Sequence, residues 1–176
     1  MPRLFTGLEI PPDIALELST LRGGLFGARW IDAENYHITL RFIGDIDNAT
    51  ARDVAHSLDE IRRPPFAVTI EELSFFGGDK PRAIIAKAQP GQALVQLQAE
   101  QERLMRRLGI PPEPRKFTPH VTLARLHSAS VHAVADYLGA RGLLSRTFEA
   151  KRFVLFSSRD SVGGGPYVIE AVYPLG

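Results

Sequence analysis

Two stretches of this sequence decide how the chain folds: RWIDAENYHITLRFIGD at residues 29–45 and KFTPHVTLARL at residues 116–126. Each stretch contains the same run of residue types, which is histidine, an apolar residue, threonine and leucine. The two runs are His37-Ile38-Thr39-Leu40 and His120-Val121-Thr122-Leu123. Their histidines are 120 minus 37, or 83, residues apart, close to half of the 176-residue chain. A run that recurs at this spacing predicts an internal duplication.

The residues around each motif predict a strand, one at 37–43 and the other at 120–126, because β-branched and apolar side chains dominate both. Successive side chains of a strand point to opposite faces, so each histidine shares a face with the threonine two positions later. The apolar residues between and after them then face the core. Each predicted strand therefore presents an imidazole and a hydroxyl together.

The rest of the chain divides into helical and extended patterns. Apolar spacing predicts helices at 12–22, 48–62, 92–108 and 131–141, with Asn48 and Ser130 as N-caps of the second and the fourth. Further strands are predicted at 3–10, 66–73, 82–88, 147–157 and 166–173, the last two separated by a turn at Gly163-Gly164-Gly165. Nearly the same order occurs in each half. We therefore expect an α+β fold of two lobes related by a pseudo-two-fold duplication, with mostly antiparallel sheets flanked by helices, as one domain over residues 1–176.

The composition limits the classes of protein to consider. Apolar residues make up 44% of the chain, which is enough for a sizeable core. The formal net charge of +1 gives no electrostatic basis for wrapping a long nucleic acid, but it suits a small anion or the end of an RNA strand. The absence of cysteine excludes disulfides and thiolate metal sites. The N-terminus lacks a continuous apolar segment and no run of ~20 apolar residues occurs, so we expect a cytoplasmic protein that does not enter a membrane.

The paired motifs suit in-line displacement at phosphorus, in which the attacking and leaving oxygens lie on opposite sides of the phosphate. One side needs a base that takes a proton from water, and the other needs an acid that protonates the departing oxygen. Histidine can serve as either near neutral pH. The hydroxyls of Thr39 and Thr122 can donate to the non-bridging oxygens, where negative charge builds up. The symmetry of the motifs makes His37 and His120 look alike, so the residues alone leave the two roles open.

Two other interpretations have to be weighed. A single motif of this kind is better explained by a structural histidine, but two copies at half-chain spacing among only five histidines are not. A metal site is the chemical rival, because histidine is a common ligand. Neither predicted strand contains an acidic residue or a further histidine, the nearest acid after His37 being Asp45, and two histidines alone make a poor divalent-metal site. We therefore expect neither a metal nor another cofactor.

The chain resembles the two-histidine phosphoesterase superfamily, and within it the bacterial and archaeal RNA 2′,3′-cyclic phosphodiesterases, also called 2′-5′ RNA ligases. The resemblance extends over residues 3–12, 29–45, 81–88, 116–126 and 155–175. It implies a bilobed fold with the active site in the central cleft. It also implies that His37 donates a proton to the leaving O3′, that His120 accepts a proton from water, and that the product ends in a 2′-phosphomonoester.

Arg125 matches the arginine that closes the second motif of this family, which is expected to meet the phosphate. Strict alternation places Arg125 on the face opposite His120, so it reaches the site only if the strand twists, bulges or ends there. Otherwise it is a surface arginine. Trp30, Phe42 and Phe117 are candidates for stacking on a base, or else ordinary core rings. Arg115 and Lys116 are candidates for the RNA backbone, or else keep a loop soluble.

The expected activity is hydrolysis of RNA 2′,3′-cyclic phosphodiester ends, with RNA ends or cyclic nucleotides as substrates. Ligation of RNA through a 2′-5′ bond at the same site is an alternative, because microscopic reversibility uses one set of groups for both directions. A third hypothesis, from another class, is a non-catalytic protein whose histidines only bind the phosphate of an RNA end. We expect the protein to act as a monomer.

Overall fold

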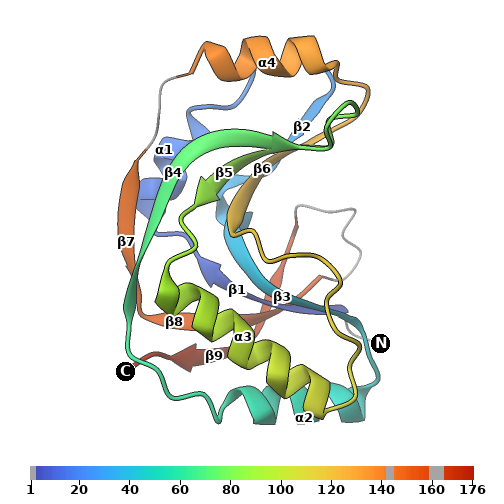
Figure 1. The fold of residues 1–176 in the computed structure, drawn as a ribbon, viewed down its shortest axis with the longest axis vertical. Coiled ribbons are helices and arrows are strands. Elements are labelled where there is room, and N and C mark those ends of the chain that lie inside the picture. Colours follow the sequence, from blue (N-terminus) through green and yellow to red (C-terminus); the bar gives the residue numbers. More distant parts are fainter. Residues whose placement is uncertain (1–2, 142–144, 159–164) are drawn as a thin grey trace.

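The structure is a computed structural model that describes residues 3–141, 145–158 and 165–176. Its elements, in chain order, are β1 (Arg3–Glu9), α1 (Pro12–Ser19), β2 (Ala28–Trp30), η1 (Ala33–Asn35), β3 (His37–Asp45), α2 (Asn48–Leu58), β4 (Phe66–Phe76), β5 (Ala83–Ala88), α3 (Gln92–Arg107), β6 (His120–Leu126), α4 (Val131–Gly139), β7 (Arg146–Ala150), β8 (Arg152–Ser157) and β9 (Val168–Pro174). The strands form one sheet in the order β7-β4-β5-β6-β3-β1-β8-β9, with β2 paired to β6 (Figure 1). Every pairing in the sheet is antiparallel.

The sheet consists of two halves that meet between the motif strands. From the centre outward, β3-β1-β8-β9 is repeated by β6-β5-β4-β7, which is the order expected of a pseudo-two-fold duplication. We call these halves the His37 lobe and the His120 lobe. Across the described residues, β3 and β6 pair at one position, Ile38 with Val121. The predicted α+β fold of two lobes is confirmed.

Helices cover both lobes from opposite ends of the molecule (Figure 1). α2 and α3 pack on each other and α3 packs on β3, whereas α4 packs on β4 and α1 on η1. The inner face of α3 carries Leu94, Leu97 and Met105, all at most 2% exposed. Spacing of three and four residues places such side chains on one helix face, which explains why this helix was predicted correctly. Apolar residues of both lobes belong to one buried cluster, so the lobes share a core.

Two predictions of local structure are wrong. The stretch 147–157 is two strands, because the chain leaves β4 of the His120 lobe at Ala150 and, as β8 from Arg152, pairs with β9 and β1 of the His37 lobe. The sequence hides this crossing, because both segments have patterns typical of strands and the crossing depends on partners far away in sequence. Asn48 is not the N-cap of α2: the carboxylate of Asp47 accepts from the Thr50 N–H at 2.7 Å.

Other boundaries differ modestly from the expectation. Helices α1, α2 and α4 end earlier than predicted, and the short elements β2 and η1 were not predicted at all. The cap of α4 is confirmed, since the Ser130 hydroxyl accepts from the Ala133 N–H at 3.0 Å. The predicted turn at residues 163–165 lies outside the described residues except for Gly165. Over the described part of the chain, no helix has the length and apolar character needed to cross a membrane.

Candidate active site

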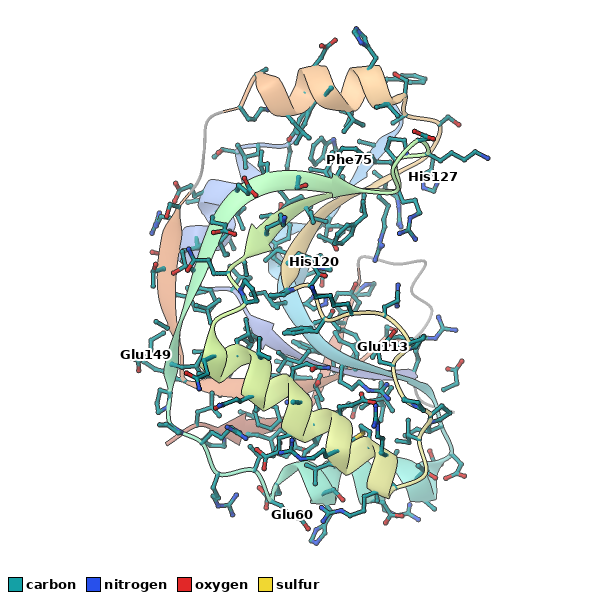
Figure 2. The ribbon with its side chains drawn as sticks, in the orientation of Figure 1. Glu60, Phe75, Glu113, His120, His127 and Glu149 are labelled. Atoms are coloured by element: carbon teal, nitrogen blue, oxygen red, sulfur yellow. The ribbon has the colours of Figure 1, made fainter. Side chains whose placement is uncertain are left out.

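A cleft of about 520 Å³ lies between the lobes, and it receives side chains from both motif strands. The five residues predicted for the site all line this cleft: His37, Thr39, His120, Thr122 and Arg125. Figure 2 shows His120 between the two lobes, with Glu113 on the loop that borders the same cleft. The fold therefore brings together side chains that are 83 residues apart in sequence, as the duplication predicted.

The pair between Ile38 and Val121 explains how the four motif side chains meet. Both apolar residues are fully buried and point away from the cleft. In antiparallel register, their neighbours lie opposite each other on the other face, so His37 stands across from Thr122 and Thr39 across from His120. Each histidine therefore has one threonine on its own strand and another on the facing strand.

Both imidazoles are held by a backbone carbonyl two residues earlier in the chain. His37 Nδ1 lies 2.9 Å from the Asn35 carbonyl oxygen, and His120 Nδ1 lies 2.6 Å from that of Thr118. A carbonyl can only accept, so in the neutral ring the proton is on Nδ1 and the lone pair is on Nε2. The Thr39 hydroxyl donates to His37 Nε2 at 2.9 Å. The fold thus selects the same tautomer at both positions and leaves Nε2 for chemistry.

Arg125 lines the cleft because β6 contains a bulge. In the pairing with β5, Ile85 faces Thr122 and Ile84 faces Ala124, so Leu123 is skipped. The extra residue shifts the alternation by one and turns Arg125 to the face of His120 and Thr122. Strict alternation, which placed Arg125 on the opposite face, therefore fails at this bulge.

The first motif strand has the same irregularity. In the pairing of β1 with β3, Gly7 faces Thr39 and Thr6 faces Arg41, which skips Leu40. Phe42 is consequently the counterpart of Arg125, five residues after its histidine, and it lines the cleft with 44% of its surface exposed. The duplicated bulge gives the cleft one cationic and one aromatic side chain at equivalent positions.

Burial makes both histidines less basic than usual. Burial, with smaller Coulombic effects of His120 and Arg125 and against the opposing effect of the Asn35 hydrogen bond, lowers the pKa of His37 to about 4. Burial also lowers the pKa of His120, as do the charges of Arg125 and Arg115. His37 packs within a ring cluster whose centroids are 4.9 Å away for Phe5 and 5.1 Å away for Tyr167. In the free protein, both imidazoles are therefore neutral near pH 7.

The cleft is much more basic than the protein as a whole. Its cationic residues are Arg3, Arg82, Arg115, Lys116 and Arg125. Among the described residues, Glu113 is the acidic one that lines it, so five minus one leaves +4 for the described lining, compared with +1 for the entire chain. Positive charge concentrated in a cleft raises the local concentration of anionic ligands. Arg3 is paired with Asp45 and Arg115 with Glu113.

A buried ion pair holds the loop at residues 110–118, which carries Arg115 and Lys116, beside the site. Arg41 is 4% exposed, and its Nε donates to Glu102 of α3 at 2.5 Å. The same guanidinium donates to the Pro111 carbonyl at 2.6 Å, and the Glu102 carboxylate accepts from the Glu113 N–H at 3.3 Å. The loop that follows carries Arg115, which lines the cleft. This arrangement couples the motif strand, α3 and the loop.

Sequence reasoning missed several of these features. Phe76 and Arg82 both line the cleft but lie outside the motif strands, Phe76 at the end of β4 and Arg82 just before β5. The ring centroid of Phe76 is 4.7 Å from that of His120. Of the three candidates for stacking on a base, Phe42 and Phe117 line the cleft, whereas the Trp30 ring packs 5.7 Å from that of Tyr137. For the described part of the chain, no group of three or more histidines, cysteines and acids is placed to hold a metal ion.

Comparison with known proteins agrees with this geometry. Residues 8–86 and 85–167 each match the model of the family described as LigT like Phosphoesterase. The chain is 32% identical over 154 residues to the RNA 2′,3′-cyclic phosphodiesterase of Aquifex aeolicus, covering 84% of this chain and 82% of that protein. It is 37% identical over 101 residues to that of Aeropyrum pernix, a match that spans 56% of this chain and 57% of the relative.

Solved structures show the same fold. The structure of E. coli LigT complexed with 3′-AMP has a TM-score of 0.80 at 24% identity, covering 99% of each chain. A protein of Thermus thermophilus has a TM-score of 0.82 at 22% identity, covering 98% of this chain and 97% of the other. A bilobed fold with two paired histidine–threonine motifs in one cleft defines the class of the two-histidine phosphoesterases. Within that class, the chain belongs to the LigT-like phosphoesterase family, whose model it matches twice.

Proposed function

We propose that this protein hydrolyses RNA 2′,3′-cyclic phosphodiester ends to 2′-phosphomonoesters, with His37 and His120 as acid and base. The observation that carries the proposal is the pair of neutral imidazoles, each with Nε2 directed to one cationic cleft and each accompanied by threonine hydroxyls. Curated relatives that cover most of this chain are RNA 2′,3′-cyclic phosphodiesterases. Their activity agrees with what two facing proton-transfer groups can do at a phosphate.

The reaction begins at His120, whose Nε2 lone pair takes a proton from a water molecule. The water oxygen attacks phosphorus in line with the bond from phosphorus to O3′. That bond breaks, and His37 gives its proton to O3′, so the products are a 3′-hydroxyl and a 2′-phosphate. Each proton transfer contributes ~10²–10⁴-fold to the rate. The assignment of donor to His37 and acceptor to His120 follows the family resemblance.

The substrate itself supplies the condition that His37 needs in order to act as an acid. In the free protein the pKa of His37 is lowered to about 4, so the ring is neutral near pH 7. An anionic phosphate beside Nε2 favours the charged imidazolium and raises this pKa. The Thr39 hydroxyl, which donates to Nε2 in the free protein, is then released to donate to a phosphate oxygen.

The two threonines and Arg125 stabilise the charge that develops on phosphorus. Thr39 and Thr122 lie on opposite strands of the cleft, so their hydroxyls can donate to different non-bridging oxygens. Arg125 lines the same cleft as His37 and His120, and its charge lowers the pKa of both, which supports a role for its guanidinium at the phosphate. Bidentate donation to a phosphate is the interaction for which a guanidinium is best suited.

The deciding experiment is turnover of a short RNA that ends in a 2′,3′-cyclic phosphate, with a chelator present throughout. We expect hydrolysis, and we expect the product to be a 2′-monophosphate rather than a 3′-monophosphate. Loss of turnover with chelator and its return with a divalent metal would contradict the metal-free mechanism. Incubation of the same RNA with a 5′-hydroxyl RNA tests 2′-5′ ligation, the reverse chemistry at this site.

A non-catalytic role as an RNA-end-binding protein makes a different prediction. In that case, His120→Ala weakens binding of the cyclic end, whereas the hydrolase predicts retained binding and a rate lower by orders of magnitude. As parts of the same proposal, we take the protein to act as a monomer, without metal or other cofactor, in the cytoplasm. Sedimentation at catalytic concentrations tests the monomer, and cell fractionation tests the location.

A further inference from the structure

The positive charge of the cleft exceeds what one cyclic phosphate requires. A cyclic phosphodiester carries one negative charge, and Arg125 is placed to meet it. Three of the cleft's cations, Arg82, Lys116 and Arg125, have no ion pair with any described residue. With Arg125 assigned to the reacting phosphate, Arg82 and Lys116 are available for another anion of the substrate.

Of these two cations, Arg82 has a backbone that is hydrogen-bonded on both sides. Its N–H donates to the Phe76 carbonyl at 2.7 Å, and its own carbonyl accepts from the Leu126 N–H at 2.8 Å. The turn before it needs a glycine: Gly77 has a φ of 117°, and a Cβ there would lie 2.6 Å from the Arg82 nitrogen. The backbone of Arg82 is therefore fixed between β4 and β6, while its side chain is exposed and lines the cleft.

The register of β5 gives the separation between Arg82 and the reacting group. Ile85 pairs with Thr122 and Ala83 pairs with Arg125. Arg82 is three positions before Ile85, and so three positions from the level of Thr122. At about 3.3 Å per residue, this is roughly 10 Å along the strand. A ribose-phosphate unit together with an extended guanidinium side chain can span that distance. Ala83 lies between Arg82 and the level of Thr122, and its small side chain leaves room for a ribose there. In the other lobe the equivalent position, opposite Phe42, is Phe5, whose ring packs on His37.

The direction of the bound strand follows from the register of the motif strands. His37 lies across from Thr122, whereas Thr39 lies across from His120. Along β6, His37 is therefore on the side of the site that leads to Arg125. As the proposed donor to O3′, His37 is on the side of the phosphate from which the ribose extends. The nucleotide that carries the cyclic phosphate therefore leads toward Arg125 and Arg82.

We propose that Arg82 binds the phosphate on the 5′ side of the terminal nucleotide. The cleft then binds an RNA strand, or a 5′-phosphorylated nucleotide, more tightly than a cyclic nucleotide with a 5′-hydroxyl. This inference rests on the proposed function of the site. It assigns a second anion-binding position to the cleft, distinct from the one at the two histidines.

Paired substrates test this position directly. One substrate is adenosine 2′,3′-cyclic phosphate with a 5′-hydroxyl, and the other is the same nucleotide with a 5′-phosphate. For the wild type we expect kcat/KM to be roughly 10- to 100-fold higher with the 5′-phosphate, as a charge-assisted hydrogen bond allows. In Arg82→Gln this ratio should fall toward one, mainly through KM, and Arg82→Lys should keep part of it. Arg103→Gln, which removes an exposed arginine of α3 outside the cleft, is the matched control and should keep the full ratio.

A binding experiment separates failure of this inference from failure of the proposed function. Calorimetry with adenosine 2′,5′-bisphosphate and adenosine 2′-monophosphate measures the same preference without turnover. Suppose that the wild type hydrolyses neither substrate but binds the bisphosphate more tightly, and that Arg82→Gln removes this preference. The proposed hydrolase activity is then refuted, and the second anion-binding position is supported. An unchanged preference in Arg82→Gln, or an equal loss with both ligands, overturns the assignment of Arg82. Circular dichroism of each variant confirms that the fold is intact.

Discussion

Ile38 of β3 and Val121 of β6 pair across the middle of the sheet, and both are fully buried. This one pair joins the two lobes between their motif strands, and it sets the register of everything on the opposite face. A slip by one residue would turn the histidines into the core and the apolar residues into the cleft. Burial of two β-branched side chains therefore aligns the groups that face the phosphate.

The first prediction separates the roles of the two histidines. Alanine at either position should lower kcat by ~10²–10⁴-fold, because each change removes one proton transfer. With a substrate whose leaving group needs no proton, such as a nucleoside 2′-nitrophenyl phosphate, activity of His37→Ala should be largely restored. His120→Ala should stay inactive, because its water is still not deprotonated. Restoration of His120→Ala alone would reverse the two roles.

The second prediction concerns stability in acid. The folded-state pKa of His37 is about 4, below its ordinary value of 6.5, so the unfolded chain binds a proton in that range and the folded protein does not. The resulting stability is complete above pH 6.5 and is lost as the pH falls toward 4. At ~1.4 kcal/mol per pKa unit, the depression from 6.5 to about 4 amounts to about 3–4 kcal/mol.

Urea unfolding between pH 4 and pH 7 measures this effect. The variant His37→Asn, which does not titrate there, should lose less stability over the same range. Equal losses in the wild type and in this variant would show that the ring is not buried uncharged.

The third prediction concerns Arg125. Besides burial, its charge lowers the pKa of both His37 and His120, so Arg125→Gln should raise both values. NMR titration of the imidazole Cε1–H signals in the free protein measures the change. Because the variant also lacks a charged donor to the phosphate, kcat/KM should fall by roughly 10- to 100-fold. Unchanged imidazole titrations would place the guanidinium outside the site.

The fourth prediction concerns the buried pair between Arg41 and Glu102. Removal of one member leaves an uncompensated buried charge, so Glu102→Ala should cost about 3–5 kcal/mol of unfolding free energy. At temperatures where the variant remains folded, KM should also rise, because the pair fastens the loop that carries Arg115. Arg106→Ala is the control: Arg106 bonds the same carboxylate but its side chain is 62% exposed, so its loss should cost less than about 1 kcal/mol. Similar costs for both variants would contradict the bracing role of Arg41.

Local sequence patterns were sufficient for much of this protein. The duplicated motif, its strands, the shared face of each histidine and threonine, and the buried stripe of α3 all follow from periodicities of two and 3.6 residues. Patterns of this kind failed where the information is not local. The crossing at Lys151 between the two lobes looks like an uninterrupted strand in the sequence, because the alternating segment before it and the apolar run after it are both typical of strands.

The sequence by itself determined which groups the site would contain, since the residue types and their half-chain repetition specify two imidazoles and two hydroxyls on strand faces. Only the tertiary structure decided how these groups work together. The skipped residues Leu40 and Leu123 depend on pairing with β1 and β5, and they turn Phe42 and Arg125 into the cleft. The low pKa of His37 depends on rings from strands distant in sequence. Register and burial are properties of the partners that a strand acquires on folding, and a residue's own sequence neighbourhood does not contain them.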